Sequence, residues 1–406
     1  MKHTIIKISL AVIFITALIL AVSSCGESSG LEFHLLEDDT YTVIGIGDCE
    51  DTELVIPKAH EGKPVTQIDK NAFNGNTKIT SVTIPEGITA IGAYAFANCE
   101  ELTEVTIPST VTKIDAYAFA GCEDFQKVHI SDLAAWCGIT FEDLTANPVF
   151  YTHRLYCGGE SIRELTIPDG VRTICDYAFT SLDTLISLTL PDSVSEIGES
   201  AFFRCTRLQD VRLSDGITKM RRGAFSLCEA LAFAEYGDGC YLGNKQNEYM
   251  VLVTTKNYEL TSLDVHENTK IIADSALWHM RTLKSVTVSD SVTTIGEEAF
   301  WDCAALESVV LGSGVRSIGT KAFYFCEKLT SINLPDSLES IGYHAFDYCL
   351  TLPSITIPDS VTTVEEGAFF ACPKITIHCE AGSAPSGWHE NWKQTDRPVV
   401  WGYTAE

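Results

Sequence analysis

Basic residues are scarce in this chain. Its 406 residues include 28 Lys and Arg against 55 Asp and Glu, so the formal charge at pH 7 is −27. Such a charge repels the phosphate backbone of nucleic acids and anionic lipid surfaces. The composition therefore predicts no nucleic-acid partner and no membrane contact through a charged surface. We interpret the acidic excess as a source of solubility.

Motifs for catalysis and metal binding are also missing. The sequence has no His-Glu-x-x-His and no glycine-rich phosphate loop. It has no Cys-x-x-Cys pair, and its histidines do not fall at metal-ligand spacing. Asp38, Asp39 and Asp238 lack the spacing of a calcium loop. We therefore expect no enzyme, no metal site and no cofactor.

A regular repeat dominates the rest of the sequence. A phenylalanine preceded by alanine recurs with a 23-residue period, and one coil has leucine in its place; the positions are Phe73, Phe96, Phe119, Phe179, Phe202, Phe225, Leu277, Phe300, Phe323, Phe346 and Phe369. A period of this length is typical of a leucine-rich-repeat solenoid, in which no coil can bury its apolar face without its neighbours. The sequence therefore predicts an elongated scaffold with an interior column of Phe side chains.

Each repeat contains the pattern of one short strand. In the unit 91–113, Val105 and Ile107 alternate with polar residues, and Pro108 follows at once. This alternation indicates a strand with one buried face, and proline ends it because proline has no N–H to donate. We expect one short parallel strand per 23-residue coil and a helical, 3₁₀ or irregular return segment. The strands are expected at Leu54, Val82, Val105, Val128, Leu165, Leu188, Val211, Leu263, Val286, Val309, Ile332 and Ile355.

The exposed residues of these strands form a candidate binding surface. Ser and Thr dominate at both ends of the series, and charged residues concentrate in the middle. A protein partner that docks on the strands should contact the charged residues, which are Glu104, Lys127, His129, Glu164, Asp210, Arg212 and Asp264. Solvated sheet polarity is the alternative account of each residue taken alone.

Fifteen cysteines would suggest disulfides in an exported protein. Eight of them, however, lie three residues after the repeat Phe, where other coils carry Asn76, Leu182 and Met280. A position that accepts Leu and Met is filled by volume, so we expect free, buried thiols there. These eight are Cys99, Cys122, Cys205, Cys228, Cys303, Cys326, Cys349 and Cys372.

The first residues have the pattern of an export signal. Lys2 and Lys7 precede an apolar run at 8–22, which is short for a membrane span of about 20 residues. Two serines then precede Cys25, as in the lipobox of bacterial lipoproteins. We predict a signal peptide over 1–24, a lipid anchor at Cys25, and a tether over 25–30. An ordinary secretory signal or an uncleaved anchor is the alternative.

Two interruptions break the period, and we predict extra loops there, near 131–160 and 237–259. The first contains Trp136, Phe150 and Tyr151, and the second reads as a small hairpin outside the main stack. Insertions in solenoids can carry binding. The alternative is that their aromatic residues pack back on the coil.

The repeated Ile-Gly-x-x-Ala-Phe-x-x-Cys-x-x-Leu-x-x-Val-x-Ile-Pro, as at 91–108 and 341–358, resembles the BspA-like family of bacterial surface leucine-rich-repeat proteins. The resemblance covers nearly all of the chain after the signal. It implies an N-terminal hairpin and first coil at 31–72, repeats over 73–375 and a closing cap at 376–406. It also implies export to a bacterial cell surface and adhesion to host matrix proteins or other cells.

Three functions remain open at this point. Adhesion to a protein partner is the first. Glycan binding is the second, and it needs aromatic platforms, which the strand face lacks; the interruptions or Trp388, Trp392, Trp401 and Tyr403 would have to supply them. These last residues are otherwise expected to cover the apolar end of the final coil. A purely structural spacer at the cell envelope is the third.

Overall fold

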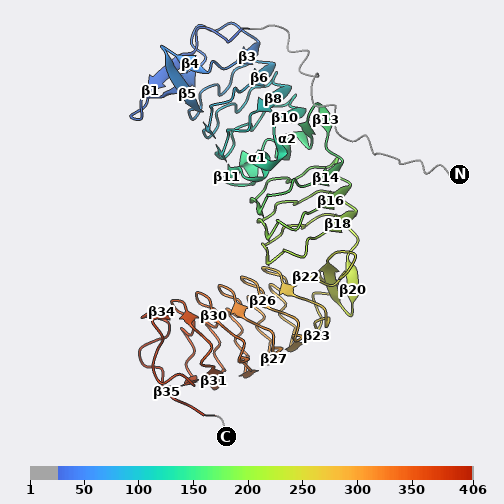
Figure 1. Ribbon diagram of the computed structural model, residues 1–406, viewed down its shortest axis with the longest axis vertical. Helices are drawn as coiled ribbons and strands as arrows, with labels where there is room; N and C mark the ends of the chain where they lie inside the picture. The colour runs from blue at the N-terminus through green and yellow to red at the C-terminus, as the bar shows by residue number, and fades with distance from the viewer. Residues whose placement is uncertain (1–25, 405–406) are drawn as a thin grey trace, which may run out of the picture.

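A computed structural model describes residues 26–404, which form a stack of coils (Figure 1). The predicted signal peptide and the predicted lipid attachment at Cys25 lie outside these residues. Within 26–404, no helix combines the length and the apolar character needed to cross a bilayer. The stack confirms the predicted leucine-rich-repeat solenoid.

One face of the stack, which we call the long-strand face, carries the predicted strands, and every predicted position lies in one. They pair in parallel with in-register neighbours, as in Val82↔Val105↔Val128. The series is β3 (Glu53–Val55), β6 (Ser81–Thr83), β8 (Glu104–Ile107), β10 (Lys127–Ile130), β12 (Leu155–Cys157), β14 (Glu164–Thr166), β16 (Ser187–Thr189), β18 (Asp210–Arg212), β23 (Ser262–Asp264), β25 (Ser285–Thr287), β27 (Ser308–Val310), β29 (Ser331–Ile332), β31 (Ser354–Ile357), β33 (Thr376–Cys379) and β35 (Val399–Trp401).

A second face, the short-strand face, carries a further strand in each coil that the sequence did not predict. All but β2, β5 and β22 have only two residues, which leaves no room for a period-2 pattern, and this is why they were missed. The series is β2 (Tyr41–Gly45), β5 (Lys63–Ile68), β7 (Ala90–Ile91), β9 (Lys113–Ile114), β11 (Thr140–Phe141), β15 (Thr173–Ile174), β17 (Glu196–Ile197), β19 (Lys219–Met220), β22 (Val251–Thr255), β24 (Ile271–Ile272), β26 (Thr294–Ile295), β28 (Ser317–Ile318), β30 (Ser340–Ile341), β32 (Thr363–Val364) and β34 (Gly387–Trp388).

Turns form the third face, which we call the turn face. The return segments on this face are irregular, and none of the repeat coils within 26–404 has a return helix. Two residues per coil adopt left-handed backbone, such as Tyr94 and Asn98 at φ 57° and 56°. Left-handed residues cannot continue an α-helix, which excludes the helical option. The repeat needs glycine in the Ile-Gly pair before these turns, because any larger residue would clash with the preceding coil. A Cβ on Gly319, for example, would lie 2.7 Å from the Glu297 nitrogen.

Side chains from all three faces meet in one continuous core. The repeat Phe side chains are buried, and within each uninterrupted run their ring centroids lie 4.9 to 5.3 Å apart with planes within 11° of parallel. This spacing is close to the roughly 4.8 Å between neighbouring strands, so strand pairing sets the stacking distance. The predicted Phe column is confirmed.

The eight repeat cysteines are buried, as predicted. Each thiol also donates to the carbonyl oxygen of the repeat Phe or Leu in the preceding coil, with Sγ···O distances of 3.0 to 3.4 Å. The cysteine therefore fills volume and gives that carbonyl a weak hydrogen bond. Burial raises the pKa of the Cys303 thiol to about 12, so this thiol stays protonated at neutral pH.

The first interruption builds a complete coil in place of an extra loop. Its turn face consists of α1 (Leu133–Cys137), the 3₁₀ turn η1 (Leu144–Ala146) and α2 (Val149–Thr152), while β11 pairs with β9 and β12 with β10. Trp136 is buried there, and its Nε1 donates to the Ala178 oxygen at 2.8 Å. An antiparallel strand, β13 (Glu160–Ser161), then ends this sheet beside β12.

The second interruption was predicted as a hairpin outside the main stack, and this prediction is wrong. The strands β20 (Ala234–Tyr236), β21 (Gly239–Leu242) and β22 form an antiparallel meander, which we call the wedge, and β22 pairs in parallel with β24. Tyr241, Val251 and Leu252 are fully buried in the common core. The alternation of apolar residues showed strands but could not show which neighbour they join.

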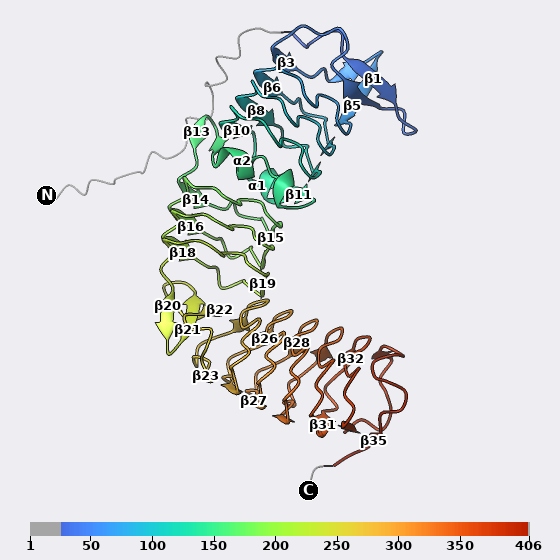
Figure 2. The same ribbon diagram turned by 180° about the vertical axis from the view of Figure 1, so that it is seen from behind.

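The wedge coincides with a bend in the solenoid (Figures 1 and 2). β22 takes the place beside β24 that β19 would hold in an uninterrupted stack, and the Asp274 N–H still reaches the Met220 oxygen at 3.0 Å. We call residues 26–233 the N-terminal arm and 260–404 the C-terminal arm. The short-strand face lies on the inner side of the bend and the long-strand face on the outer side.

Both ends of the described stack have their own cover. At the start, β1 (Glu32–Leu35) pairs antiparallel with β2, and β4 (Ala59–His60) with β5. At the other end, Trp388 and Trp392 are buried, and the Trp392 ring meets Phe369 edge-on at 5.8 Å. These two tryptophans close the apolar column and are not available as sugar platforms.

The buried thiols lead to a test of the core. In the chain from Gly26 onward, we expect the eight repeat cysteines to resist a disulfide-exchange reagent at pH 8 until the protein is unfolded, because burial keeps the reagent from reaching them. Cys157 and Cys175, which are only partly buried, should react first.

Cys326→Ala should lower the free energy of unfolding by about 1–2 kcal/mol, because it leaves a small cavity in the column. The exposed neighbour Glu327→Ala should stay within about 0.5 kcal/mol of the original protein. Denaturant titration measures both. Equal stability of the two variants would contradict the volume-filling role.

Candidate binding surface

Three of the predicted site residues form one cluster on the long-strand face. Lys127 of β10 lies directly opposite Glu104 of β8, and its Nζ is 3.5 Å from the Glu104 carboxylate. His129 Nε2 approaches the same carboxylate at 3.6 Å. The ring of Tyr156 on β12 lies 5.1 Å from the His129 ring. We call Glu104, Lys127, His129 and Tyr156 the upper cluster; the sequence prediction lacked only Tyr156.

A second group lies further along the same face. Arg212 Nε donates to the Asp210 carboxylate on the same strand at 3.0 Å. Glu164 on β14 stands in register with Asp210, one strand apart through Ser187. The structure therefore brings Glu164, Asp210 and Arg212 together as a lower cluster. Asp264 on β23 belongs to the C-terminal arm, in a different sheet, and joins neither cluster.

These ion pairs contribute little to the stability of the fold. The Lys127 and Glu104 side chains are 45% and 42% exposed, and those of Arg212 and Asp210 are 49% and 55% exposed. Exposed pairs of this kind stabilise a protein by about 0.2–1 kcal/mol, because water screens them. Their charges can therefore exchange partners at small cost when another surface docks.

A group of charges at the inner side of the bend was missed by sequence reasoning. Arg221 Nη1 donates to both carboxylate oxygens of Asp176 at 3.0 Å. Lys219 Nζ donates to the Glu297 carboxylate at 2.8 Å and so joins the N-terminal arm to the C-terminal arm. The irregular spacing between Val211 and Leu263 marks this region, but nothing in it shows that these residues meet.

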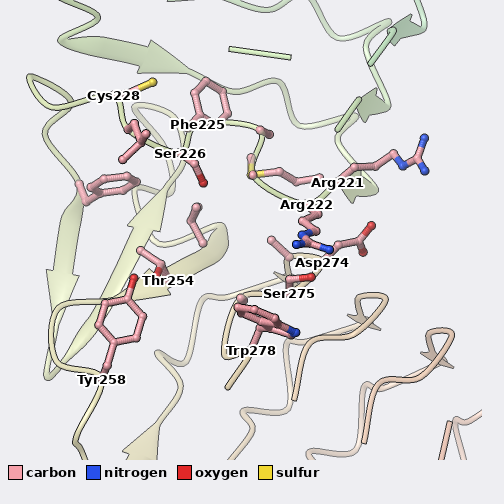
Figure 3. A pocket seen from close by; sticks show the side chains of 18 of the residues that line it. Arg221, Arg222, Phe225, Ser226, Cys228, Thr254, Tyr258, Asp274, Ser275 and Trp278 are labelled. Atoms are coloured by element: carbon pink, nitrogen blue, oxygen red, sulfur yellow. The ribbon is translucent and has the colours of Figure 1, made fainter. Parts of the chain in front are cut away.

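Asp274 is the buried acid of this inner group (Figure 3). Burial raises its pKa from 3.8 to about 7, an effect that the nearby Glu297 carboxylate reinforces. The Glu297 N–H donates to the Asp274 carboxyl at 2.8 Å, and this bond together with Lys219 and Arg221 opposes the rise. Asp274 therefore changes charge near neutral pH at the point where the arms join.

Aromatic side chains gather on the turn face of the C-terminal arm, a feature that sequence reasoning also missed. Trp301 and Tyr324 lie 5.1 Å apart, Tyr324 and Phe325 4.5 Å, and Phe325 and Tyr348 4.5 Å. Tyr343 and Tyr348 are each 39% exposed. We call these five residues the aromatic cluster. The signal was present in the sequence, because all five flank the repeat Phe within two or three positions.

The described residues contain no group of three or more His, Cys, Asp or Glu arranged to hold a metal ion. Against known families, the chain matches the BspA type leucine rich repeat region in six copies, over residues 48–142, 152–241 and 254–376. The chain belongs to this family. The resemblance drawn from the repeated Ile-Gly and Ala-Phe steps is thereby confirmed. No curated protein matches the chain.

Solved structures similar to this chain include a leucine rich cell surface protein from Faecalibacterium prausnitzii. It is 26% identical, with 95% of this chain and all of that chain covered and a TM-score of 0.41. A leucine-rich repeat protein from Bacteroides ovatus is 23% identical over 91% and 89% of the two chains, with a TM-score of 0.38. The pneumococcal vaccine antigen PcpA is 17% identical over 93% and 98%, with a TM-score of 0.40.

The pKa of Asp274 predicts a pH effect on stability. In the unfolded chain this acid loses its proton near pH 4, and in the folded chain near pH 7. Between these values the folded state holds more protons, so stability falls as pH rises through the window. The loss is at most about 4 kcal/mol, at about 1.4 kcal/mol per pKa unit.

Asp274→Asn keeps an oxygen for the Glu297 N–H and removes the charge. Its free energy of unfolding, measured by denaturant titration at pH 5 and pH 8, should fall less between the two values than that of the original protein. A parallel decrease in both proteins would show that Asp274 does not titrate in this range.

Proposed function

We propose that this protein is an exported cell-surface scaffold that binds a macromolecular partner, most simply a protein, through the long-strand face. The observation that carries the proposal is the upper cluster together with the lower cluster. Both present charges of two signs on strands whose backbone is fixed by pairing with a neighbouring strand. Other exposed positions of this face are mostly Ser and Thr, so the clusters stand out as sites for specific contact.

Rigidity makes these clusters suitable for recognition. A side chain on a paired strand has a fixed position, so a partner does not have to order a loop when it binds. Oppositely charged residues at known spacing favour one register of docking and disfavour others. Tyr156 beside His129 adds an aromatic contact of the kind enriched at binding hot spots. An extracellular matrix protein or a protein of another cell would suit such a surface.

Location at the cell surface rests on the sequence. An apolar run at 8–22 followed by two serines and Cys25 favours export and lipid attachment. Two or three acyl chains on one cysteine would anchor the protein lastingly, because each buried CH₂ contributes about 0.8 kcal/mol. A solenoid held this way can present either face to a partner outside the cell.

Anchoring can be tested in a bacterium that expresses the full chain. A labelled fatty acid should enter the original protein, and Cys25→Ala should carry no label while the protein is still made. Cys49→Ala serves as the control for loss of a cysteine and should keep the label. Label in the Cys25→Ala variant would contradict lipidation at this residue.

Binding can be tested with the soluble chain from Gly26 onward on an array of immobilised matrix proteins and glycans. For a protein that binds, replacing Lys127, His129, Asp210 and Arg212 together with alanine should weaken binding at least tenfold. Lys284→Ala with Glu307→Ala, both exposed charges on the C-terminal arm, should leave binding unchanged. Equal affinity of the two variants would show that the charged residues of the long-strand face do not contact the partner.

Glycan binding is the second candidate, and the aromatic cluster favours it. Exposed aromatic rings such as those of Tyr343 and Tyr348 can pack on the apolar faces of sugars. If the array shows glycans in place of proteins, Tyr343→Ala with Tyr348→Ala should abolish binding, and the fourfold charge variant should not. Binding to neither class would favour a structural spacer.

A further inference from the structure

The turn face is held together by a repeated set of backbone hydrogen bonds. Seven coils share the full set: the N–H groups two residues before the repeat Phe or Leu, at it and two residues after it donate to carbonyls of the next coil. Lys321, Phe323 and Phe325 donate in this way to Tyr343, Ala345 and Asp347 at 2.8 to 3.1 Å. We call this series the turn ladder. It works as a third parallel sheet made of turns.

At the bend the turn ladder is open. The corresponding donors are the N–H groups of Gly223, Phe225 and Leu227, and the corresponding acceptors are the carbonyls of Asp274, Ala276 and Trp278. Among residues 26–404, none of these six groups has a hydrogen-bond partner. All six residues line one cavity of about 440 Å³ between the arms (Figure 3). We call this cavity the notch.

The other interruption fills the centre of such a gap with its own side chains. There the Ala178 oxygen accepts from Trp136 Nε1 at 2.8 Å and from Asn147 Nδ2 at 3.0 Å, and the Tyr117 N–H donates to Thr145 Oγ1 at 3.2 Å. Side chains of the irregular coil thus satisfy the central carbonyl of the next coil. The wedge supplies no such group to Asp274, Ala276 or Trp278.

The three donors lie at alternate residues and face three acceptors at alternate residues, so they are the two edges of one missing rung of the turn ladder. Unpaired backbone edges are templates for pairing with another chain. A volume of about 440 Å³ lies within the roughly 300–1,000 Å³ of ordinary ligand sites. The walls include apolar side chains of Phe225, Phe233 and Val253, and Trp278 and Leu227 are exposed at the rim, at 38% and 58%.

We propose that the notch binds a peptide segment of a partner protein, which inserts between the arms in the turn conformation of the coils, as an additional rung of the turn ladder. Its carbonyls accept from Gly223, Phe225 and Leu227, and its N–H groups donate to Asp274, Ala276 and Trp278. One side chain of the segment faces the apolar wall, so this residue is apolar. Proline is excluded at the donating positions because it has no N–H.

A folded second copy of this chain does not suit the notch. The turn segments of a folded copy are held within their own coils, so none is free to enter a slot with hydrogen-bonding groups on both sides. The occupant therefore has to be a segment without a ladder of its own. This site is separate from the long-strand face, and its test does not depend on the function proposed above.

The chain itself supplies a suitable test peptide. Residues 319–325, Gly-Thr-Lys-Ala-Phe-Tyr-Phe, accept from one coil through the carbonyls of Thr320, Ala322 and Tyr324, and donate to the next through three N–H groups. An acetylated and amidated peptide of this sequence therefore matches both edges of the notch. A control peptide carries N-methyl groups at the three donating positions.

Calorimetric titration of the chain from Gly26 onward with both peptides tests the proposal. We expect saturable binding of the first peptide and at least tenfold weaker binding of the methylated one. Leu227→Asp at the rim should weaken binding at least fivefold. Asn98→Asp changes an exposed residue at the same repeat position on a closed part of the turn ladder, where the Asn98 N–H donates to the Ala120 oxygen at 2.6 Å, and should not weaken it.

Hydrogen exchange of the same samples reports the notch directly. In the free protein, the amides of Gly223, Phe225 and Leu227 should exchange at least tenfold faster than those of Lys321, Phe323 and Phe325, and the peptide should slow them. Equal protection in the free protein, equal affinity of the two peptides, or unchanged binding by Leu227→Asp would each overturn the proposal. Slower exchange of these amides that appears only when the protein dimerises would also overturn the proposal, because it would show that a second copy of the chain fills the notch.

Discussion

Contact between successive coils is the interaction on which this structure depends. A single coil has no core of its own, because its Phe and Cys side chains are covered only by the same residues of the coils before and after it. Its backbone is satisfied in the same way, through parallel strands on two faces and the turn ladder on the third. Stability in such a stack is a sum of terms between nearest neighbours, so any coil that cannot pair with its neighbour affects the whole molecule.

The wedge is the place where this pairing is redirected. β22 takes the position next to β24, and the N-terminal arm keeps contact with the C-terminal arm through the shared core, the Asp274 to Met220 hydrogen bond and the Lys219 to Glu297 ion pair. Two coils that are not fully in register cannot keep the strand pairing on two faces and the turn ladder on the third face at the same time. The molecule closes its core and gives up the turn ladder at the bend, which leaves the notch.

Specific binding on a repetitive scaffold needs positions where the repeat is varied. Three surfaces of this protein meet this condition in different ways. The upper and lower clusters put charges on a face of Ser and Thr. The aromatic cluster fills turn positions that hold small or polar residues in many other coils, and the notch exposes backbone groups that are paired in most coils. Each variation leaves the buried positions unchanged, so a surface of this kind can differ between related proteins without loss of the fold.

The sequence alone determined the solenoid, the long strands, the Phe column and the burial of the repeat cysteines, because these follow from the spacing of apolar residues within one coil. It also placed Glu104, Lys127 and His129 on one face, since alternation along a strand decides which side chains point outward. Tertiary structure alone decided the second strand of the regular coils, which has only two residues and is too short to leave a pattern. It also decided the pairing of β22 with β24, the bend, the meeting of Lys219 with Glu297 and the open turn ladder. These features depend on which segments become neighbours across 20 to 80 positions of sequence, and hydrophobic periodicity carries no information about that choice.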